Sequence, residues 1–111
     1  MQVFQHQALD GLYAISTTNV LDLKGISEGL AGRVRIAAGT RSPEQGMRTS
    51  AAHEIAYVIC GRLRIETEVG HHEVAAGDML VTSPAEPHST TALQDSELFF
   101  VLLDPLLAPT R

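Results

Sequence analysis

The histidines are the residues of this chain best suited to acid–base or metal chemistry, and they stand at positions 6, 53, 71, 72 and 88. Imidazole titrates near neutral pH and is a common metal ligand, so histidines grouped by the fold would mark a site. The one cysteine, Cys60, can form no intramolecular disulfide, and nothing in the sequence marks a cation that would activate its thiol. We therefore interpret Cys60 as an unreactive core residue. It lies an even number of residues after Glu54, so strand alternation would turn both side chains to the same, inward side.

Short stretches with strand character must position these side chains. Glycine and proline interrupt the chain often, and between them apolar and polar residues alternate, most strictly from Arg62 to Val69. Period-two alternation with frequent turns is typical of an all-β sandwich or barrel. Only Ser27 to Ala31 could form a turn of helix, with Ser27 as its N-cap. Strands are expected at Val34–Ala37, Glu54–Ile59, Leu63–Val69, Glu73–Ala75, Met79–Val81 and Leu98–Leu103.

Glycines predict the turns between the central strands. Gly61 supplies the positive φ of a tight hairpin, and Gly77 marks another turn before Met79. We expect a third turn at Gly70-His71-His72, which would leave both of its histidines exposed to solvent.

Two stretches resemble the two conserved motifs of the cupins. Glu54 and Gly61 have six residues between them, as at the end of the first motif, G(X)5HXH(X)3-4E(X)6G. Gly77 and His88 have ten between them, as in the second motif, G(X)5PXG(X)2H(X)3N. The resemblance covers roughly Val34 to Asp104 and implies a small single-domain cupin of the RmlC-like kind, a jelly-roll β-barrel with an internal pocket. We expect one domain over residues 1–111: an N-terminal strand or loop segment at 1–30, a barrel core at 34–104 and a tail at 105–111.

The resemblance also implies a pocket lined by Glu54 and His88, which occupy surviving ligand positions of the motifs. These two would form an acid–base couple able to bind a ligand or move a proton. Arg48 and Ser50 fall on first-motif positions and are expected to contact the ligand, with Arg48 or Arg41 near the pocket mouth. Each arginine could instead be a solvated loop cation. If Glu54 points inward, strand alternation turns His53 outward unless a bulge reverses it.

The departures from the motifs disfavour a metal cofactor. In the two registers of the first motif the histidine pair falls on Met47 and Thr49 or on Arg48 and Ser50. Only Glu54 and His88 remain of four ligands, and protein metal sites generally use three or four. We predict no cofactor, with a weak divalent-cation site at Glu54 and His88 as the disfavoured alternative. The second motif departs too, with Ser83, Ala85 and Ala92 in place of its proline, glycine and asparagine.

Two classes of function fit these residues. The favoured one is a module that binds a small polar molecule, without metal or with a weakly held one. The alternative is a cupin enzyme, an isomerase, cyclase or lyase, in which Glu54 and His88 are catalytic and transfer protons. A metal-dependent dioxygenase is less favoured, because the histidine pair is missing.

Composition limits the partners. The 111 residues carry a formal net charge of −5, which disfavours nucleic acid. No apolar run is long enough for a membrane helix, and no secretory signal is visible, so a reduced cytoplasmic setting is expected. Because the chain ends at Arg111, we also expect no DNA-binding helix pair. The run from Leu98 to Leu103 is apolar on both faces, and with Leu106 and Leu107 it predicts a homodimer.

Overall fold

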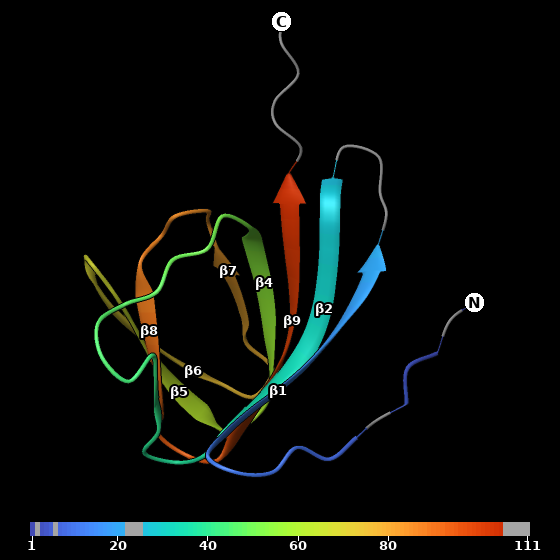
Figure 1. Ribbon diagram of the computed structural model, residues 1–111. Helices are drawn as coiled ribbons and strands as arrows, with labels where there is room; N and C mark the ends of the chain where they lie inside the picture. The colour runs from blue at the N-terminus through green and yellow to red at the C-terminus, as the bar shows by residue number, and fades with distance from the viewer. Residues whose placement is uncertain (2, 6, 22–25, 106–111) are drawn as a thin grey trace, which may run out of the picture.

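Two antiparallel β-sheets make up the computed structural model, which describes residues 1, 3–5, 7–21 and 26–105 (Figure 1). The five-stranded sheet has the order β1-β2-β9-β4-β7, and the four-stranded sheet has the order β3-β8-β5-β6. The predicted all-β jelly-roll is therefore confirmed. In chain order the strands are β1 Tyr13–Leu21, β2 Ile26–Ile36, β3 Arg41–Ser42, β4 His53–Cys60, β5 Arg62–Thr67, β6 Gly70–Ala75, β7 Met79–Thr82, β8 His88–Ala92 and β9 Ser96–Pro105.

The structure adds strands that the sequence pattern did not predict. β1 and β8 each contain a run of three consecutive serine and threonine residues, so neither has the apolar alternation of a recognisable strand. The helical turn expected at Ser27–Ala31 is wrong, because these residues belong to β2 and pair with both β1 and β9. The five-stranded sheet thus includes part of the predicted N-terminal segment. The described residues form no helix, and so none that could cross a membrane.

The hydrophobic core lies between the two sheets toward one end of the barrel. Strand alternation turns one side chain in two inward, and burial of these apolar side chains is the main stabilising term. Val58, Leu63, Ala92 and Leu98 are among the buried inward residues, none more than 6% exposed. This end of the barrel is closed to solvent.

The strand β9 lies in the middle of its sheet, between β2 and β4. Its apolar run is therefore not at an exposed edge of the sheet, because both of its edges are paired. Its inward face is in the core, with Phe100 only 7% exposed, while Phe99 on the outward face is 42% exposed. The apolar surface that a second subunit would have to cover is therefore the outer face of this sheet. Leu106 and Leu107 lie outside the described residues.

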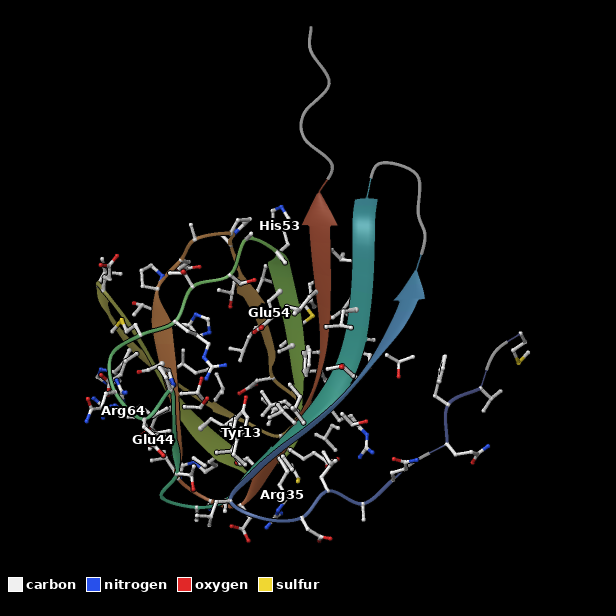
Figure 2. All side chains as sticks on the ribbon, viewed as in Figure 1. Tyr13, Arg35, Glu44, His53, Glu54 and Arg64 are labelled. Atoms are coloured by element: carbon white, nitrogen blue, oxygen red, sulfur yellow. The ribbon has the colours of Figure 1, made fainter. Side chains whose placement is uncertain are left out.

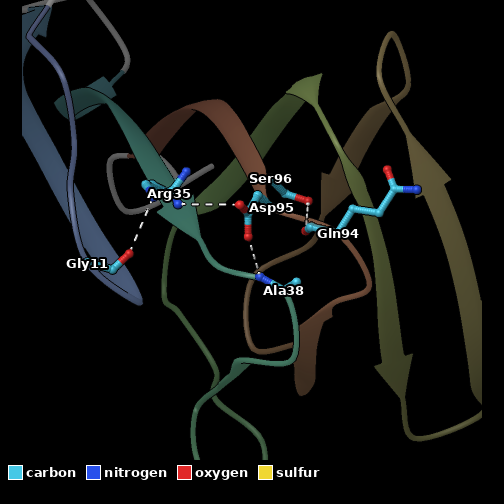
Figure 3. A network of polar contacts seen from close by, with 6 residues as sticks. All are labelled: Gly11, Arg35, Ala38, Gln94, Asp95 and Ser96. Carbon is cyan, nitrogen blue, oxygen red and sulfur yellow. Dashed lines mark hydrogen bonds and ion pairs between the residues drawn. The ribbon is translucent and has the colours of Figure 1, made fainter.

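A polar network ties the loops together at the closed end (Figure 3). Asp95 accepts a hydrogen bond of 2.8 Å from the backbone N–H of Ala38 and forms an ion pair of 3.7 Å with Arg35. The hydroxyl of Ser96, which is fully buried, donates to the carbonyl oxygens of Gln94 and Arg62. These bonds hold the β8–β9 turn against the β4–β5 turn, where Gly61 lies.

The two turn glycines that the sequence marked are predicted to differ in their cost when changed to alanine. Both have positive φ, +92° at Gly61 and +94° at Gly77, which costs an alanine about 1 kcal/mol. A Cβ at Gly61 would also overlap the Ser96 hydroxyl and the Asp95 carbonyl oxygen, whereas one at Gly77 would meet no atom. Gly61→Ala should therefore lower the free energy of unfolding by about 3 kcal/mol or more, and Gly77→Ala by about 1 kcal/mol, in urea denaturation. Equal losses would contradict the steric argument.

Candidate functional site

A pocket of about 280 Å³ lies between the two sheets, toward the end of the barrel opposite the network of Figure 3. Its deep wall is apolar and includes Val34, Ile36, Leu98 and Phe100. The polar side chains that line it are Tyr13, Ser42, Arg48, Glu54, Thr67, His72, Thr82, Glu86, His88 and Thr90. Half of the residues that line the pocket are therefore polar, which is more than in the usual, mostly apolar small-molecule site.

Polarity increases from the closed end to the open end along the inward-facing rows of β4, β5 and β8, whereas the inward residues of β9 remain apolar. On β4 the inward residues run from Val58, fully buried, through Ala56 to Glu54, which is partly buried. On β8 they run from Ala92 to His88, and in the neighbouring strand β5 Thr67 pairs with His88. The register therefore gathers the polar ends of several strands at the open end.

Glu54 enters the pocket from the five-stranded sheet. It pairs with Thr82 on β7 and with Leu102 on β9, and all three residues line the pocket. Figure 2 shows the Glu54 side chain on the inner side of β4. His53, the residue before it, is exposed and does not line the pocket, as alternation predicted.

His88 enters the pocket from the four-stranded sheet, and Arg48 enters it from the neighbouring loop between β3 and β4. Their backbones form an isolated antiparallel bridge, with N–H to O distances of 3.0 and 3.1 Å in the two directions. The bridge holds a loop cation and an imidazole side by side. The Nδ1 atom of His88 lies 3.2 Å from the carbonyl oxygen of Glu86; since a carbonyl oxygen only accepts, Nδ1 donates there and Nε2 is left for other partners.

Glu54 and His88 line one pocket but do not contact each other. Among the described residues, neither a hydrogen bond nor an ion pair joins Glu54 to His88 or to Arg48. The two members of the acid–base couple expected from the motifs are therefore not bonded directly to each other in this arrangement. The carboxylate and the imidazole instead approach a shared space from different sheets.

Other predicted residues lie outside the pocket. Ser50 does not line it: its hydroxyl accepts from the N–H of Ala52 at 3.1 Å, and its carbonyl accepts from Ala85. Arg41 does not reach the mouth, because its guanidinium donates to the carbonyl oxygens of Pro43 and Gly46, both at 2.8 Å. These hydrogen bonds stabilise the loop that contains Arg48.

The inward orientation expected for Cys60 is wrong, since the residue is exposed. The pairing of β4 with β9 shifts register between Val58 and Cys60, and this irregularity breaks the alternation that Glu54, Ala56 and Val58 follow.

His72 is the histidine that sequence reasoning misplaced. The turn expected at Gly70-His71-His72 lies earlier, because Thr67 already pairs with Gly70 and both histidines belong to β6. His72 pairs with inward-facing Ile65 and lines the pocket, although much of its surface remains exposed, while His71 points outward. The signal was present: Val74 is apolar and buried, so alternation along β6 turns His72 to the same side.

The donor set does not fit a bound metal ion. In the part of the chain that the structure describes, no three histidine, cysteine, aspartate or glutamate side chains come together as ligands. A cation, Arg48, lines the pocket beside His88, and a fixed positive charge disfavours a divalent ion there. His6 lies outside the described residues.

Comparisons with known proteins agree with this architecture. The family model described as AraC-like ligand binding domain matches residues 30–108. An RmlC-like cupin from Shewanella frigidimarina NCIMB 400 superposes with a TM-score of 0.66 at 14% identity, over 87% of this chain and 80% of that one. KdgF from Halomonas sp. gives a TM-score of 0.66 at 18% identity, over 92% and 86% of the two chains.

The cupin domain of Cnp3 from Schizosaccharomyces pombe gives a TM-score of 0.70 at 10% identity, over 87% of this chain and 68% of that one. At these identities the superpositions show a shared fold and nothing about ligands. A search of curated protein sequences finds no match.

Ala85 has a backbone conformation that suits glycine, in the loop that leads to His88. Its φ of 62° lies in the left-handed region, and its N–H donates to the Ser50 carbonyl at 2.7 Å. The second cupin motif has a glycine at this position. The loop therefore keeps the glycine conformation without the glycine, and the alanine side chain strains it.

We predict that Ala85→Gly raises the free energy of unfolding by about 1 kcal/mol, because glycine adopts this φ without the steric cost. Urea denaturation measures the change. Ala76→Gly is the matched control, since Ala76 is an exposed turn residue without a positive φ, and it should lower stability slightly. A loss of stability in Ala85→Gly would contradict the strain.

Proposed function

The chain belongs to the family of AraC-like ligand-binding domains, and from that premise we propose that it binds a small polar molecule between its two sheets without a metal ion. The observation that carries the proposal is the distribution of polarity in the pocket. Polar side chains gather at the open end, and apolar ones form the deep wall. A polar molecule with some apolar surface would satisfy both parts.

Three side chains have the main roles in this proposal. Glu54 accepts hydrogen bonds from the ligand on one side of the pocket. On the other side Arg48 supplies a planar, permanently charged donor, and His88 supplies Nε2 as a donor or acceptor. The backbone bridge between Arg48 and His88 favours binding, because groups already held in place lose less entropy on binding.

An enzyme of the isomerase, cyclase or lyase type is the alternative function. Glu54 and His88 approach the pocket from different sheets, so they could act as acid and base on opposite sides of one substrate. This alternative differs from simple binding in one measurable way, because the bound compound would change chemically.

The proposal includes neither nucleic acid nor a membrane as a partner. The net charge is −5, and four arginines of the outer surfaces are paired with carboxylates. These pairs leave little positive surface for phosphate groups. We also retain the expectation of a reducing, cytoplasmic setting, where the exposed thiol of Cys60 would not be oxidised to an intermolecular disulfide.

We further propose that the chain forms a homodimer through the outer face of the five-stranded sheet. Val3, Phe4 and other residues of the N-terminal segment form a groove with the β1–β2 side of that face and with Phe99. Beyond it Ile55, Tyr57, Met79 and Phe99 form an apolar strip over β4, β7 and β9, with exposed fractions of 38–66%. A second copy carries the same strip, and a strip without charge is where two chains of net charge −5 repel least.

The first prediction from this proposal concerns the pocket. Titrating a library of small polar metabolites into the labelled protein should shift the NMR signals of pocket residues for at least one compound. Glu54→Gln and His88→Gln should each weaken that binding about tenfold or more, because each removes a directional polar contact in a partly buried site. Treatment with EDTA should leave the affinity unchanged.

Matched controls are available on the outer face of the four-stranded sheet. Glu73→Gln and His71→Gln make the same chemical changes at exposed positions of β6 and should leave binding unaltered. Affinity lost on EDTA treatment and restored by one divalent metal would refute the metal-free proposal. Turnover of the bound compound, lost in the pocket variants, would establish the enzyme alternative instead.

The second prediction concerns the apolar strip. Light scattering at micromolar concentration should give twice the chain mass of 11.9 kDa for the unmodified protein. Tyr57→Asp should give the monomer, because it places a charge in the strip. Val69→Asp is the control, since Val69 is 97% exposed at the β5–β6 turn, and it should remain dimeric. A monomeric unmodified protein would disprove the interface.

A further inference from the structure

Arg48, Glu54 and Glu86 line the pocket, and none of the three forms an ion pair in the part of the chain that the structure describes. Glu86 is exposed and accepts a hydrogen bond from the backbone N–H of Ser83. The other two side chains, which have opposite charges, therefore carry the inference.

Arg33, Arg35, Arg62 and Arg64 each pair with a carboxylate, but Arg48 pairs with none of the described ones. Glu54 likewise accepts no hydrogen bond from a described side chain and forms no ion pair. Glu54 is partly buried, and a charge in a partly apolar site is stabilised by a partner of opposite sign. Arg48 is exposed at the pocket rim, so its guanidinium is accessible to a ligand.

The surroundings of Arg48 favour an anion with a single charge. Its guanidinium donates to the Ser42 hydroxyl, and Ser42 also lines the pocket. The Arg48 guanidinium has further N–H donors, and their spacing matches the two oxygens of a carboxylate. A phosphate dianion fits less well, because one arginine neutralises only half of its charge and Glu54 adds repulsion in the same cavity.

The surroundings of Glu54 favour a hydrogen-bond donor. Thr82 and Leu102 are its cross-strand neighbours, so no cation flanks it on either adjoining strand. A ligand hydroxyl or ammonium group would give this carboxylate the donor that it lacks. A ligand carboxylate at the same place would meet a like charge.

Apolar side chains line the pocket on both sheets, one inward position deeper than Glu54 and His88. Leu80 and Phe100 lie next to Glu54 on the five-stranded sheet, one inward position deeper, and Ile65 lies on the opposite sheet. A ligand that spans from one sheet to the other therefore needs an uncharged carbon body between its polar ends. The cavity of about 280 Å³ limits that body to a few carbons.

Resting on the proposed function, we propose that the ligand is a small hydroxy- or amino-carboxylate. Its carboxylate binds the Arg48 guanidinium beside the Ser42 hydroxyl, and its hydroxyl or ammonium group donates to Glu54. Arg48 and Glu54 thus select the two ends of one molecule, and the orientation of the ligand is set by the opposite signs of the two groups.

The test is an NMR titration of the full chain with matched probes of four to six carbons. The bifunctional probes are hydroxy- and amino-carboxylates substituted at carbon 2 or at the end of the chain. The single-function probes are the parent carboxylates, alcohols and amines of equal length, and the neutral probes are pentitols. We expect at least one bifunctional probe to bind about tenfold tighter than either of its single-function parents.

Two variants assign the ends of the ligand. Arg48→Met should weaken every carboxylate probe about tenfold and leave the alcohols and amines unchanged. Glu54→Gln should remove the advantage of the bifunctional probe over its parent carboxylate. Arg62→Met and Glu73→Gln are the matched controls: these residues form an exposed ion pair of 2.8 Å on the outer face, and neither change should affect any probe.

The outcomes separate this inference from the proposed function. Equal binding of bifunctional and single-function probes, or tighter binding of a pentitol that is insensitive to both pocket variants, would overturn the inference and leave small-molecule binding intact. If no probe and no member of the metabolite library shifts a pocket signal, the proposed function fails together with the inference.

Discussion

The register of β4 against its two neighbours is the constraint on which the rest of the site depends. Side chains alternate across a strand, so a slip of one residue would turn Glu54 outward and Ile55 into the barrel. The register is held because β4 pairs with β9 on one side and with β7 on the other. Burial of Ala56 and Val58 in the core then makes any other register unfavourable, and the carboxylate is directed inward by the apolar residues that follow it.

The same arrangement explains why the barrel is packed at one end and hollow at the other. Core side chains and the network around Asp95 and Ser96 fill the closed end. Toward the open end the inward positions of β4, β5 and β8 become polar, and polar groups cannot close a dry core without partners. The residues that stabilise the fold and the residues that line the pocket therefore lie at opposite ends of the same strands. Polar residues of the pocket can be replaced while the core stays packed.

Arg48 shows how one fold can hold different chemistry. In one register of the first motif it falls where the metal-binding cupins have a histidine, and the structure puts it in the pocket beside His88. Under the proposed function, a guanidinium at that place has a fixed charge where a metal-binding cupin has a ligand, and this charge would bind an anion directly. Arg41 supports this arrangement from outside the pocket, because it bonds two carbonyl oxygens of the loop that carries Arg48.

The sequence by itself determined the fold class, because alternation and turn glycines are local signals that survive in a single chain. The resemblance to the cupin motifs implied the inward position of Glu54. The sequence also placed Gly61 correctly at a turn with positive φ. Only the tertiary structure decided which neighbours each strand has. It brought His72 into the pocket, left Ser50 outside it, and kept Glu54 apart from His88. Pairing between strands distant in the sequence sets these relations, and periodicity within one strand carries no information about them.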